Sequence, residues 1–298
     1  MLHEIAPHHY HVEFKTEDPA PDDLLCLFSE GKILLKDTDE IALPTVEEME
    51  PYLRTLPEKE PAFSTAPGGR YTFLCFIDEM NFFGMPCVCL PAPEGYVYRT
   101  AYEVRFGHPQ HMVYGVMMAH QLNKWYETHV YCGKCGAHNV HAAKERAIVC
   151  PSCGNLIYPQ ICPSVIIGIK NGSKMLCTQY NPKHNPGARM PHPKNRSYAL
   201  VAGYIESGET PEEAVHRESM EEVGLKVKNL KYYKSQPWPF SGSLLLGYTC
   251  EVDGDDTITM EEDELSVAEW IDRKDMQDRS GDISLTSEIM ESFRTGKL

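Results

Sequence analysis

The sequence predicts an α/β (α+β) protein, in which an α/β/α sandwich on a mixed sheet follows a small four-cysteine module and a smaller α/β N-terminal domain. Three observations predict this architecture. Short apolar runs alternate with turn signals over residues 1–107, two Cys-x-x-Cys pairs lie within 132–153, and strand patterns surround helix patterns after residue 161. A chain of 298 residues, 42% of them hydrophobic, is long enough for separate cores. We therefore expect three parts, residues 1–127, 128–160 and 161–298.

Charge and cysteine content exclude several classes of protein. A net charge of −15 argues against a protein that holds nucleic acid mainly through a basic surface. The N-terminus has no basic flank and no apolar run, and no stretch of eighteen apolar residues occurs, so we expect a soluble, cytoplasmic protein with no membrane partner. Eleven mostly scattered cysteines fit a reducing compartment. The C-terminal Gly-Lys-Leu differs by one residue from the peroxisomal Ser-Lys-Leu address, which leaves that compartment as an alternative.

The N-terminal part reads as short strands and two helices. A hairpin is predicted around residues 29–31, and apolar spacing predicts a long helix before the cysteines. The predicted strands are Leu24–Phe28, Lys32–Lys36, Tyr71–Ile77 and Met85–Leu90, and the predicted helices are Val46–Leu53 and Pro109–Glu127. His8, His9 and His11 are either a metal cluster or part of a solvated terminus, and we favour the solvated terminus.

Two pairs of cysteines have the spacing of a zinc ribbon. Fourteen residues separate the pair Cys132 and Cys135 from the pair Cys150 and Cys153, and each pair is followed by a glycine that lets backbone wrap the sulfurs. Four thiolates complete a tetrahedral shell and leave no open position, so the predicted Zn²⁺ is structural, with one ion per chain. His138 and His141 lie between the pairs but are not needed as ligands.

The C-terminal part alternates strands with two helices. Asn171-Gly172 predicts a hairpin, and Ser197–Gly203 leads into a glycine-rich loop. The predicted strands are Ser164–Lys170, Met175–Gln179, Ser197–Gly203, Lys226–Lys234, Ser243–Val252 and Leu265–Ile271, and the last helix is Leu285–Arg294.

A further helix carries the main concentration of chemistry. Thr210 is a predicted N-cap with Glu213 in a capping box, and Gly224 ends the helix that begins at Pro211. At 100° per residue, Glu218, Glu221 and Glu222 share one arc. Like charges at this spacing repel, and a hard divalent cation such as Mg²⁺ would relieve the repulsion. A solvated acidic face is the alternative for this pattern alone.

Residues Ser235–Phe240 hold two prolines and two aromatic side chains. We interpret them as a stiff apolar loop, whose exposed aromatics suit stacking on a base or nicotinamide ring. A packed surface turn is the alternative.

Together these motifs resemble a known family. Gly203, Glu209, Arg217-Glu218, Glu221-Glu222 and Gly224-Leu225 match the Nudix box, in which a loop and helix cradle a metal-bound diphosphate. Residues 125–294 are similar to the NADH pyrophosphatase branch of the Nudix hydrolases. That similarity is carried by Trp125, Tyr131, the four cysteines, Tyr158-Pro159-Gln160, Gly203–Glu206 and SQPWPF followed by Ser243. Ser219 departs from the usual aliphatic residue at a position that faces the core, and Ser241 replaces a proline.

The resemblance implies a homodimer that hydrolyses NADH or NAD⁺ to nicotinamide mononucleotide and AMP, and some relatives also remove NAD caps from RNA. It implies Mg²⁺ or Mn²⁺ held by Glu218, Glu221, Glu222, Glu264 and the carbonyl of Ala202. Glu222 is the expected general base, with Glu264 second, and Glu209 and Arg217 would orient the loop. The predicted substrate-binding residues are Tyr158, Tyr204, Gln236, Pro237, Trp238, Pro239, Phe240 and Ser243.

Alternatives to this function stay open. Hydrolysis of ADP-ribose or another nucleoside diphosphate derivative shares the box but does not explain SQPWPF. A non-enzymatic nucleotide- or RNA-binding module is an alternative of a different class. Loss of one of the metal-binding carboxylates would have favoured it, but all of them are present. The basic segment 180–196 either approaches substrate phosphates or is a solvated insertion.

Overall fold

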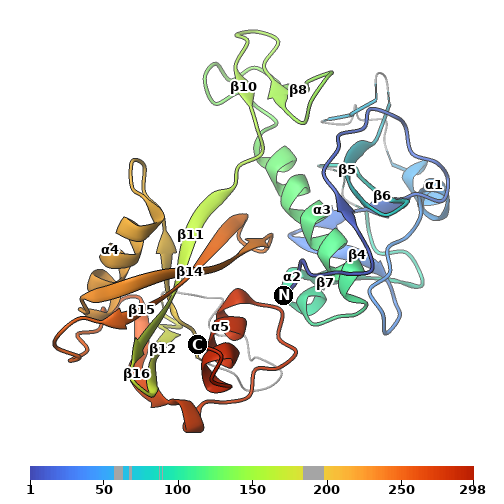
Figure 1. Ribbon diagram of the computed structural model, residues 1–298. Coiled ribbons are helices and arrows are strands. Elements are labelled where there is room, and N and C mark those ends of the chain that lie inside the picture. The colour runs from blue at the N-terminus through green and yellow to red at the C-terminus, as the bar shows by residue number, and fades with distance from the viewer. Residues whose placement is uncertain (57–62, 67–68, 87, 89, 184–197) are drawn as a thin grey trace. The chain divides into compact units, whose positions relative to one another are not determined.

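The computed structural model describes residues 1–56, 63–66, 69–86, 88, 90–183 and 198–298 (Figure 1). The chain forms two compact units. Unit 1 comprises residues 1–2, 161–238 and 243–298, and unit 2 comprises residues 3–160 and 239–242. Within the described ranges, no helix combines the length and the apolar character needed to cross a membrane.

Unit 1 is built on a mixed sheet. The strand order is β14-β15-β11-β12-β16, with β13 paired to β11. Strand β11 runs parallel to β15, and the other pairs are antiparallel. The strands are β11 (Cys162–Asn171), β12 (Lys174–Tyr180), β13 (Val201–Tyr204), β14 (Val227–Trp238), β15 (Ser243–Val252) and β16 (Leu265–Asp272).

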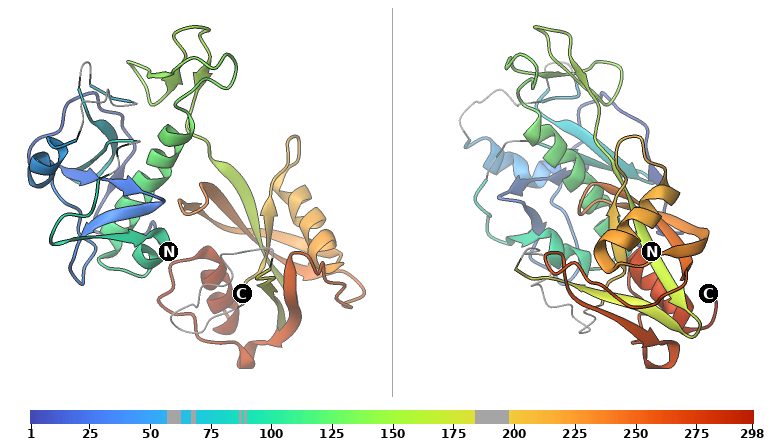
Figure 2. Two further views of the ribbon diagram at one scale, coloured as in Figure 1. Left: turned by 180° about the vertical axis from the view of Figure 1, so that it is seen from behind. Right: turned by 90° about the vertical axis from the view of Figure 1, so that its left-hand side faces the viewer.

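Helices α4 (Pro211–Val223) and α5 (Leu285–Arg294) cover opposite faces of this sheet (Figures 1 and 2). The alternation of side chains along the central strand β11 explains the two layers. Val165 and Ile167 belong to the core beneath α4, whereas Ile166 belongs to the core beneath α5. At Gly168 a Cβ atom would lie 2.9 Å from Cγ2 of Ile289, so the absence of a side chain lets α5 approach the strand. The predicted α/β/α sandwich is confirmed.

The start of α5 is fixed by a buried glutamine from β14. Gln236 is fully buried; its Nε2 donates to the carbonyl oxygen of Ile283 at 2.7 Å, and its Oε1 accepts from the backbone N–H of Leu285 at 2.7 Å. Ser284, between them, is the N-cap of α5 and accepts from the N–H of Ser287. One side chain therefore satisfies the Leu285 N–H and adds a second donor to the Ile283 carbonyl, which also accepts from the N–H of Leu2.

The described residues of unit 2 form two small sheets, three helices and the cysteine module. Its sheets have the orders β1-β5-β6-β2 and β3-β4-β7. The elements are β1 (Tyr10–His11), β2 (Leu24–Cys26), β3 (Phe28–Ser29), β4 (Lys32–Lys36), α1 (Val46–Leu53), β5 (Thr72–Ile77), β6 (Met80–Gly84), β7 (Tyr96–Thr100), α2 (Ala101–Arg105) and α3 (Gln110–Thr128). Helix α3 packs closely on the first sheet, because a Cβ at Gly115 would lie 2.5 Å from the ring of Phe82.

The cysteine module forms a three-stranded sheet of β8 (Val140–His141), β9 (Ile148–Val149) and β10 (Leu156–Ile157). Its packing within unit 2 is aromatic and polar. The ring of His141 stacks on Phe14 with centroids 5.0 Å apart, and its Nε2 is 2.8 Å from the hydroxyl of Tyr126 in α3. Nη1 of Arg146 donates to the carbonyl of Phe73. His141 therefore links the module to the N-terminal residues of the same unit.

Most predicted elements agree with the structure to within a few residues, and α1, α5 and β15 agree at both ends. Five predictions need correction. The strand predicted at Met85–Leu90 is wrong where it can be compared, because β6 lies before it at Met80–Gly84; residues 87 and 89 lie outside the described ranges. Of the predicted hairpin, only β3 pairs with β4, since β2 joins the other sheet.

The N-terminal histidines are not simply solvated. Tyr10 and His11 form β1 at the edge of β5, and His8 contacts Asp78. The loop predicted over Ser235–Phe240 is also wrong, since β14 continues to Trp238 and only residues 239–242 turn. Ala199 bridges to Thr178 and β13 begins at Val201, so the strand predicted from Ser197 starts later; Ser197 and most of segment 180–196 lie outside the described residues.

Gln236→Leu tests the link between β14 and α5. The substitution leaves the Leu285 N–H buried without a partner and the Ile283 carbonyl with only the Leu2 N–H as donor, so we expect unit 1 to lose about 2 kcal/mol of unfolding free energy. Urea unfolding followed by fluorescence of Trp238 and Trp270 measures this loss. Gln277→Leu is the matched control, because that side chain is exposed and its replacement should change stability by less than about 0.5 kcal/mol. Equal effects of both substitutions would contradict the assignment.

Candidate active site

Helix α4 begins and ends as its sequence predicts. Thr210 accepts from the N–H of Glu213, and the Glu213 side chain accepts from the N–H of Thr210. At the other end Gly224 has a φ of +70°, and the N–H of Leu225 donates to the carbonyl of Ser219. Ser219 itself is fully buried, which confirms that this position faces the core. The helix is thus held at both ends, and its glutamates keep fixed positions.

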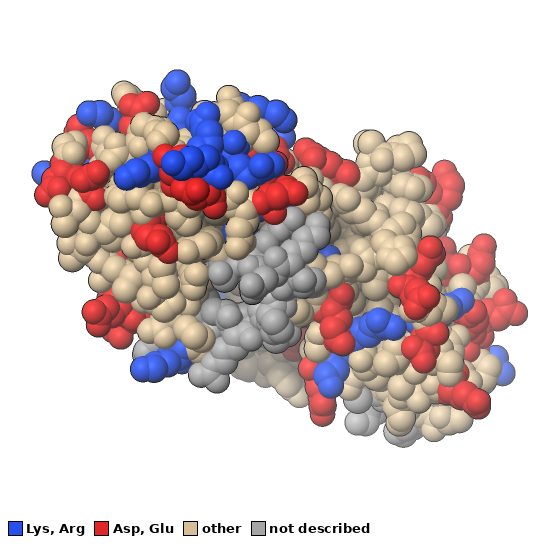
Figure 3. All heavy atoms as spheres, turned by 90° about the horizontal axis from the view of Figure 1, so that it is seen from below, with Lys and Arg blue, Asp and Glu red and all other residues tan. Residues whose placement is uncertain are grey.

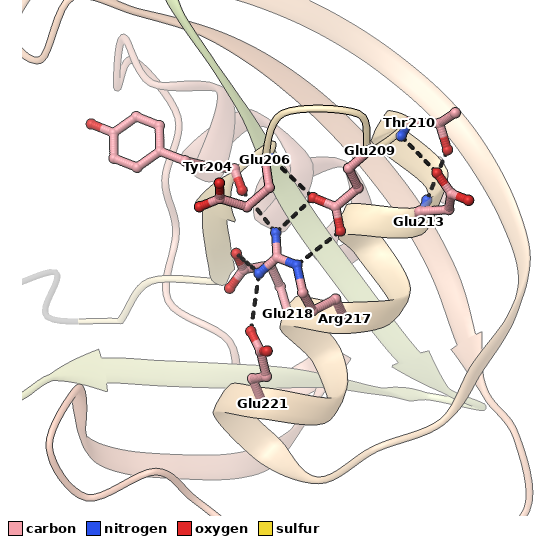
Figure 4. A network of polar contacts seen from close by, with 8 residues as sticks. All are labelled: Tyr204, Glu206, Glu209, Thr210, Glu213, Arg217, Glu218 and Glu221. Carbon is pink, nitrogen blue, oxygen red and sulfur yellow. Dashed lines mark hydrogen bonds and ion pairs between the residues drawn. The ribbon is translucent and has the colours of Figure 1, made fainter.

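Arg217 lies at the centre of a polar network at the N-terminal side of this helix (Figure 4). Its Nε and Nη2 donate to the two carboxylate oxygens of Glu209, each at 2.8 Å, and this pairing lowers the pKa of Glu209 to about 2. Nη1 donates to Glu218 at 2.6 Å and to Glu221 at 3.0 Å. Nη2 also reaches the carbonyl of Tyr204 at 2.9 Å, while the Tyr204 ring points away from the network. Arg217 therefore joins the loop to the helix.

Glu222 is the most deeply buried of the predicted metal-binding glutamates. Its side chain is 2% exposed, and Oε1 accepts from the N–H of Ala202 at 3.2 Å. The second oxygen, Oε2, is buried and has no hydrogen-bond partner. Burial raises the pKa of Glu222 to about 8, and the charges of Glu218 and Glu264 add to the rise despite the Ala202 hydrogen bond. The free oxygen of such a carboxylate can still bind a cation.

Glu218 lies directly over β13. A Cβ at Gly203 would fall 1.9 Å from Oε1 of Glu218, so only glycine leaves room for this carboxylate. Burial raises the pKa of Glu218, and the contact with Arg217 partly opposes that effect. Glu221, one turn along, is exposed. Two of the three box glutamates are therefore buried against the sheet, and the third borders solvent.

Glu264 and Tyr180 complete the surroundings of these carboxylates. Glu264 is exposed and acts electrostatically on both Glu218 and Glu222. The pKa of Tyr180 is raised by burial and by the charges of Glu222, Glu264 and Glu218, so its hydroxyl lies within the electric field of all three. Tyr180 was not among the residues predicted from the sequence. No motif marks it, and it reaches the site only because β12 ends there.

The glutamates fit a hard divalent cation without forming a closed ligand set. Among the described residues, only the four cysteines form a group of three or more potential ligands with all ligand atoms within 4.8 Å of one another. Glu218 and Glu221 instead contact Arg217. The unpaired Oε2 of Glu222 and the surplus of negative charge are nevertheless what Mg²⁺ or Mn²⁺ would satisfy, with water and substrate oxygens as the remaining ligands.

The four cysteines converge as a zinc site requires. Sγ of Cys132 is 3.7 Å from Sγ of Cys153, and Sγ of Cys135 is 3.5 Å from Sγ of Cys150. Tetrahedral ligation with Zn–S bonds of about 2.3 Å separates sulfurs by about 3.8 Å, so these distances fit. His141 was predicted not to be needed as a zinc ligand. Its contacts to Tyr126 and to the carbonyl of Ala142 are consistent with that prediction. The chain therefore carries a structural zinc ribbon.

Two glycines shape the ribbon's knuckles. Gly136 and Gly154 have φ values of +75° and +71°, a region that side-chain-bearing residues rarely adopt. Each donates its N–H to the carbonyl of the first cysteine in its pair, at 2.8 and 2.9 Å. The backbone N–H of Lys134 also approaches Sγ of Cys132, and such donors lower the pKa of that thiol to about 6.

The predicted substrate-binding residues differ in exposure. Tyr204 and Tyr158 are 53% and 51% exposed, so both rings are accessible. Ser243 is buried and lies opposite Trp238 in the β14–β15 ladder. Both ends of the Gln236 amide are taken by the backbone before α5. The remaining members of the set are Pro237, Pro239 and Phe240, of which Pro239 is buried and the other two are partly buried.

Comparison with known proteins gives matches in both regions. Residues 163–289 match the NUDIX domain family, and residues 127–158 match the NADH pyrophosphatase zinc ribbon domain. A protein named NAD-capped RNA hydrolase NudC from Chromobacterium violaceum is 34% identical over 259 residues, covering 86% of each chain. A protein of the same name from Actinobacillus succinogenes is 42% identical over 120 residues, which is 39% of this chain and 42% of that one.

Among solved structures, a NUDIX hydrolase from Nitrosomonas europaea aligns with a TM-score of 0.46 and 16% identity. The alignment covers 56% of this chain and 91% of that one.

Cys135→Ser tests the zinc site. Losing one of four ligands should release the ion, whose binding contributes on the order of 10 kcal/mol to such a module. Metal analysis after dialysis should find one Zn²⁺ per unsubstituted chain and almost none in the variant. Cys162→Ser is the control, since Cys162 is equally an exposed free cysteine but lies outside the group. Retention of a full zinc equivalent by Cys135→Ser would contradict the assignment.

Proposed function

The chain belongs to the NADH pyrophosphatase branch of the Nudix hydrolases, and we propose that it hydrolyses the diphosphate of NADH or NAD⁺ to nicotinamide mononucleotide and AMP and removes NAD caps from RNA. The observation that carries the proposal is the buried, unpaired carboxylate oxygen of Glu222 within an intact set of box glutamates. A binding module without catalysis has no need to bury such a group at the cost of its solvation.

Glu218, Glu221, Glu222, Glu264 and the carbonyl of Ala202 would hold Mg²⁺ or Mn²⁺. When bound, these cations would neutralise the diphosphate, polarise the attacked phosphorus and lower the pKa of a water molecule. Glu218 needs no movement of the backbone to serve, because Gly203 already leaves room for its carboxylate. Arg217 and Glu209 would orient the loop through the paired hydrogen bonds between them rather than touch substrate.

Glu222 is the proposed general base, with Glu264 as the second candidate. A base must be deprotonated when water attacks, and a cation beside Glu222 would bring down the raised pKa of this carboxyl. Glu222 would then accept the proton of the attacking water. The new bond joins the water oxygen to phosphorus, the bond between that phosphorus and the bridging oxygen breaks, and the second phosphate leaves as part of the other mononucleotide.

The nucleotide pocket is proposed from the family signature. The exposed ring of Tyr204 follows the glycine that accommodates Glu218, which favours stacking on a base close to the diphosphate. The signature also proposes further substrate-binding residues, which are Tyr158, Pro237, Trp238, Pro239, Phe240 and Ser243. Gln236 would contribute indirectly by fixing the start of α5.

Capped RNA as a substrate has support in the distribution of charge. Although the net charge is −15, Lys and Arg side chains gather on part of the face drawn in Figure 3. On unit 1, β14 and the residue before it carry Lys226, Lys228, Lys231 and Lys234. Phosphates of an RNA chain can bind such lysines. We further propose that the protein acts as a homodimer in the cytoplasm, which light scattering and cell fractionation would test.

Glu222→Gln tests the proposed reaction. With Mg²⁺ or Mn²⁺ present, the unsubstituted protein should release nicotinamide mononucleotide from NADH, NAD⁺ and NAD-capped RNA. ADP-ribose is tested in parallel as a fourth substrate, and the products are separated by chromatography. Loss of the base should lower the rate about a thousandfold. Glu212→Gln is the matched control on the same helix, where the side chain only accepts from the hydroxyl of Tyr248. No cleavage of any of the four substrates by folded, zinc-loaded protein would reject the enzyme.

The pH dependence of metal binding gives a second test. Protons compete with the cation for Glu222, whose pKa is raised to about 8 without metal. Below that pH the apparent Mn²⁺ affinity should therefore rise with pH, by up to about tenfold per pH unit, and level off above it. Calorimetric titration at several pH values measures the slope. In Glu222→Gln the slope should become shallower, and an unchanged slope would show that another group controls binding.

A further inference from the structure

The segment that carries Glu264 is attached to the catalytic helix by its backbone. We call residues 259–264 the acidic loop. The N–H of Glu261 donates to the carbonyl of Glu222 at 2.9 Å, and the N–H of Thr259 donates to the carbonyl of Val223 at 3.0 Å. Thr259 also packs against Gly224, where a Cβ would lie 2.9 Å from the Cβ of Thr259. One side of the acidic loop thus extends the C-terminal end of α4.

The other side of the acidic loop is attached to Asn181, the residue after β12. The N–H of Asn181 donates to the carbonyl of Glu264 at 2.8 Å, and its Nδ2 donates to the carbonyl of Glu262 at 2.8 Å. Oδ1 of the same amide accepts from the N–H of Lys183 at 3.0 Å, which fixes the amide with its nitrogen toward the loop. A single residue therefore binds two carbonyls of the acidic loop, one on each side of Asp263.

The end of β12 places Asn181 at this point. The β12–β16 register shifts between Gln179 and Tyr180, so Tyr180 lies opposite Leu265, directly after Glu264. Tyr180 packs against the core beneath α4, and Asn181 follows it at the loop. Glu264 is exposed and has no side-chain hydrogen bond among the described residues, so the backbone of the acidic loop alone sets the position of its carboxylate.

We propose that Asn181 is a positioning residue, which holds the acidic loop so that the Glu264 carboxylate stays beside Glu218 and Glu222 and completes the divalent-cation site. This inference rests on the proposed function. The Asn181 amide touches neither substrate nor cation and acts only through the carbonyl of Glu262. Its loss leaves the backbone hydrogen bond to Glu264 in place, so the acidic loop loosens without detaching.

A double-mutant cycle on Mn²⁺ affinity tests the proposal. The full-length protein carries Asn181→Ala, Glu264→Gln or both, with zinc retained, and free Mn²⁺ is measured by its paramagnetic resonance signal. Residues that orient metal ligands change affinity by about tenfold or more, so Asn181→Ala should weaken binding by about tenfold. In the Glu264→Gln background the same substitution should change affinity less than about twofold, because the ligand it positions is already altered.

A matched control separates positioning from general loosening. Asn171→Ala removes another asparagine side chain, whose Nδ2 donates to Asp256 at 2.7 Å outside the acidic loop, and Mn²⁺ affinity should stay unchanged. Equal weakening by Asn181→Ala in both backgrounds, or no weakening, would overturn the proposal while leaving the hydrolase intact. Failure of the unsubstituted protein to bind Mn²⁺ would instead reject the metal-dependent function, and the positioning role with it.

Discussion

The crowding of carboxylates at the C-terminal half of α4 is the constraint on which the rest of unit 1 depends. Glu218 and Glu222 are 8% and 2% exposed, and both face the sheet. Burying two like charges is unfavourable, because each loses hydration and each repels the other. Arg217 compensates one of them, Glu218, whereas Glu222 has a single backbone donor. The site is therefore organised so that one carboxylate is held and the other remains underpaired.

Several neighbouring features follow from making room for these two groups. Gly203 has no side chain where Glu218 lies, and the N–H of Ala202 next to it is directed at Glu222. Because both residues belong to β13, the pairing of that strand with β11 determines how far the carboxylates stand from the sheet. The caps of α4 also hold the carboxylates in place, because fraying of the helix at Gly224 would release Glu222 first. The register of β13 and the caps of α4 together fix the positions of the Glu218 and Glu222 carboxylates.

The sequence predicted those parts of the site whose residues are close together along the chain. The caps of α4, its three glutamates and the Cys-x-x-Cys pairs are local patterns, and the structure contains each of them. Tyr180, Asn181 and the contacts of Gln236 with the backbone before α5 were not predicted. Asn181 binds a carbonyl 81 residues away and Gln236 one 47 residues away, so no short-range spacing reports them. The loop predicted at Ser235–Phe240 failed for a related reason: prolines at the end of an edge strand do not stop its pairing.

The underpaired oxygen of Glu222 connects stability to activity. A buried acceptor without a partner costs about 1–3 kcal/mol, and a charged one costs more, so the chain without a cation either keeps Glu222 protonated or bears that cost. A cation that binds only the folded chain removes the penalty and stabilises the fold by mass action. The oxygen that makes the folded chain less stable alone would thus suit a hard cation, since no side chain of the described residues bonds to it. Replacing Glu222 by a neutral residue should make the fold more stable while removing the reaction, which is the trade-off expected of a group retained for catalysis rather than for folding.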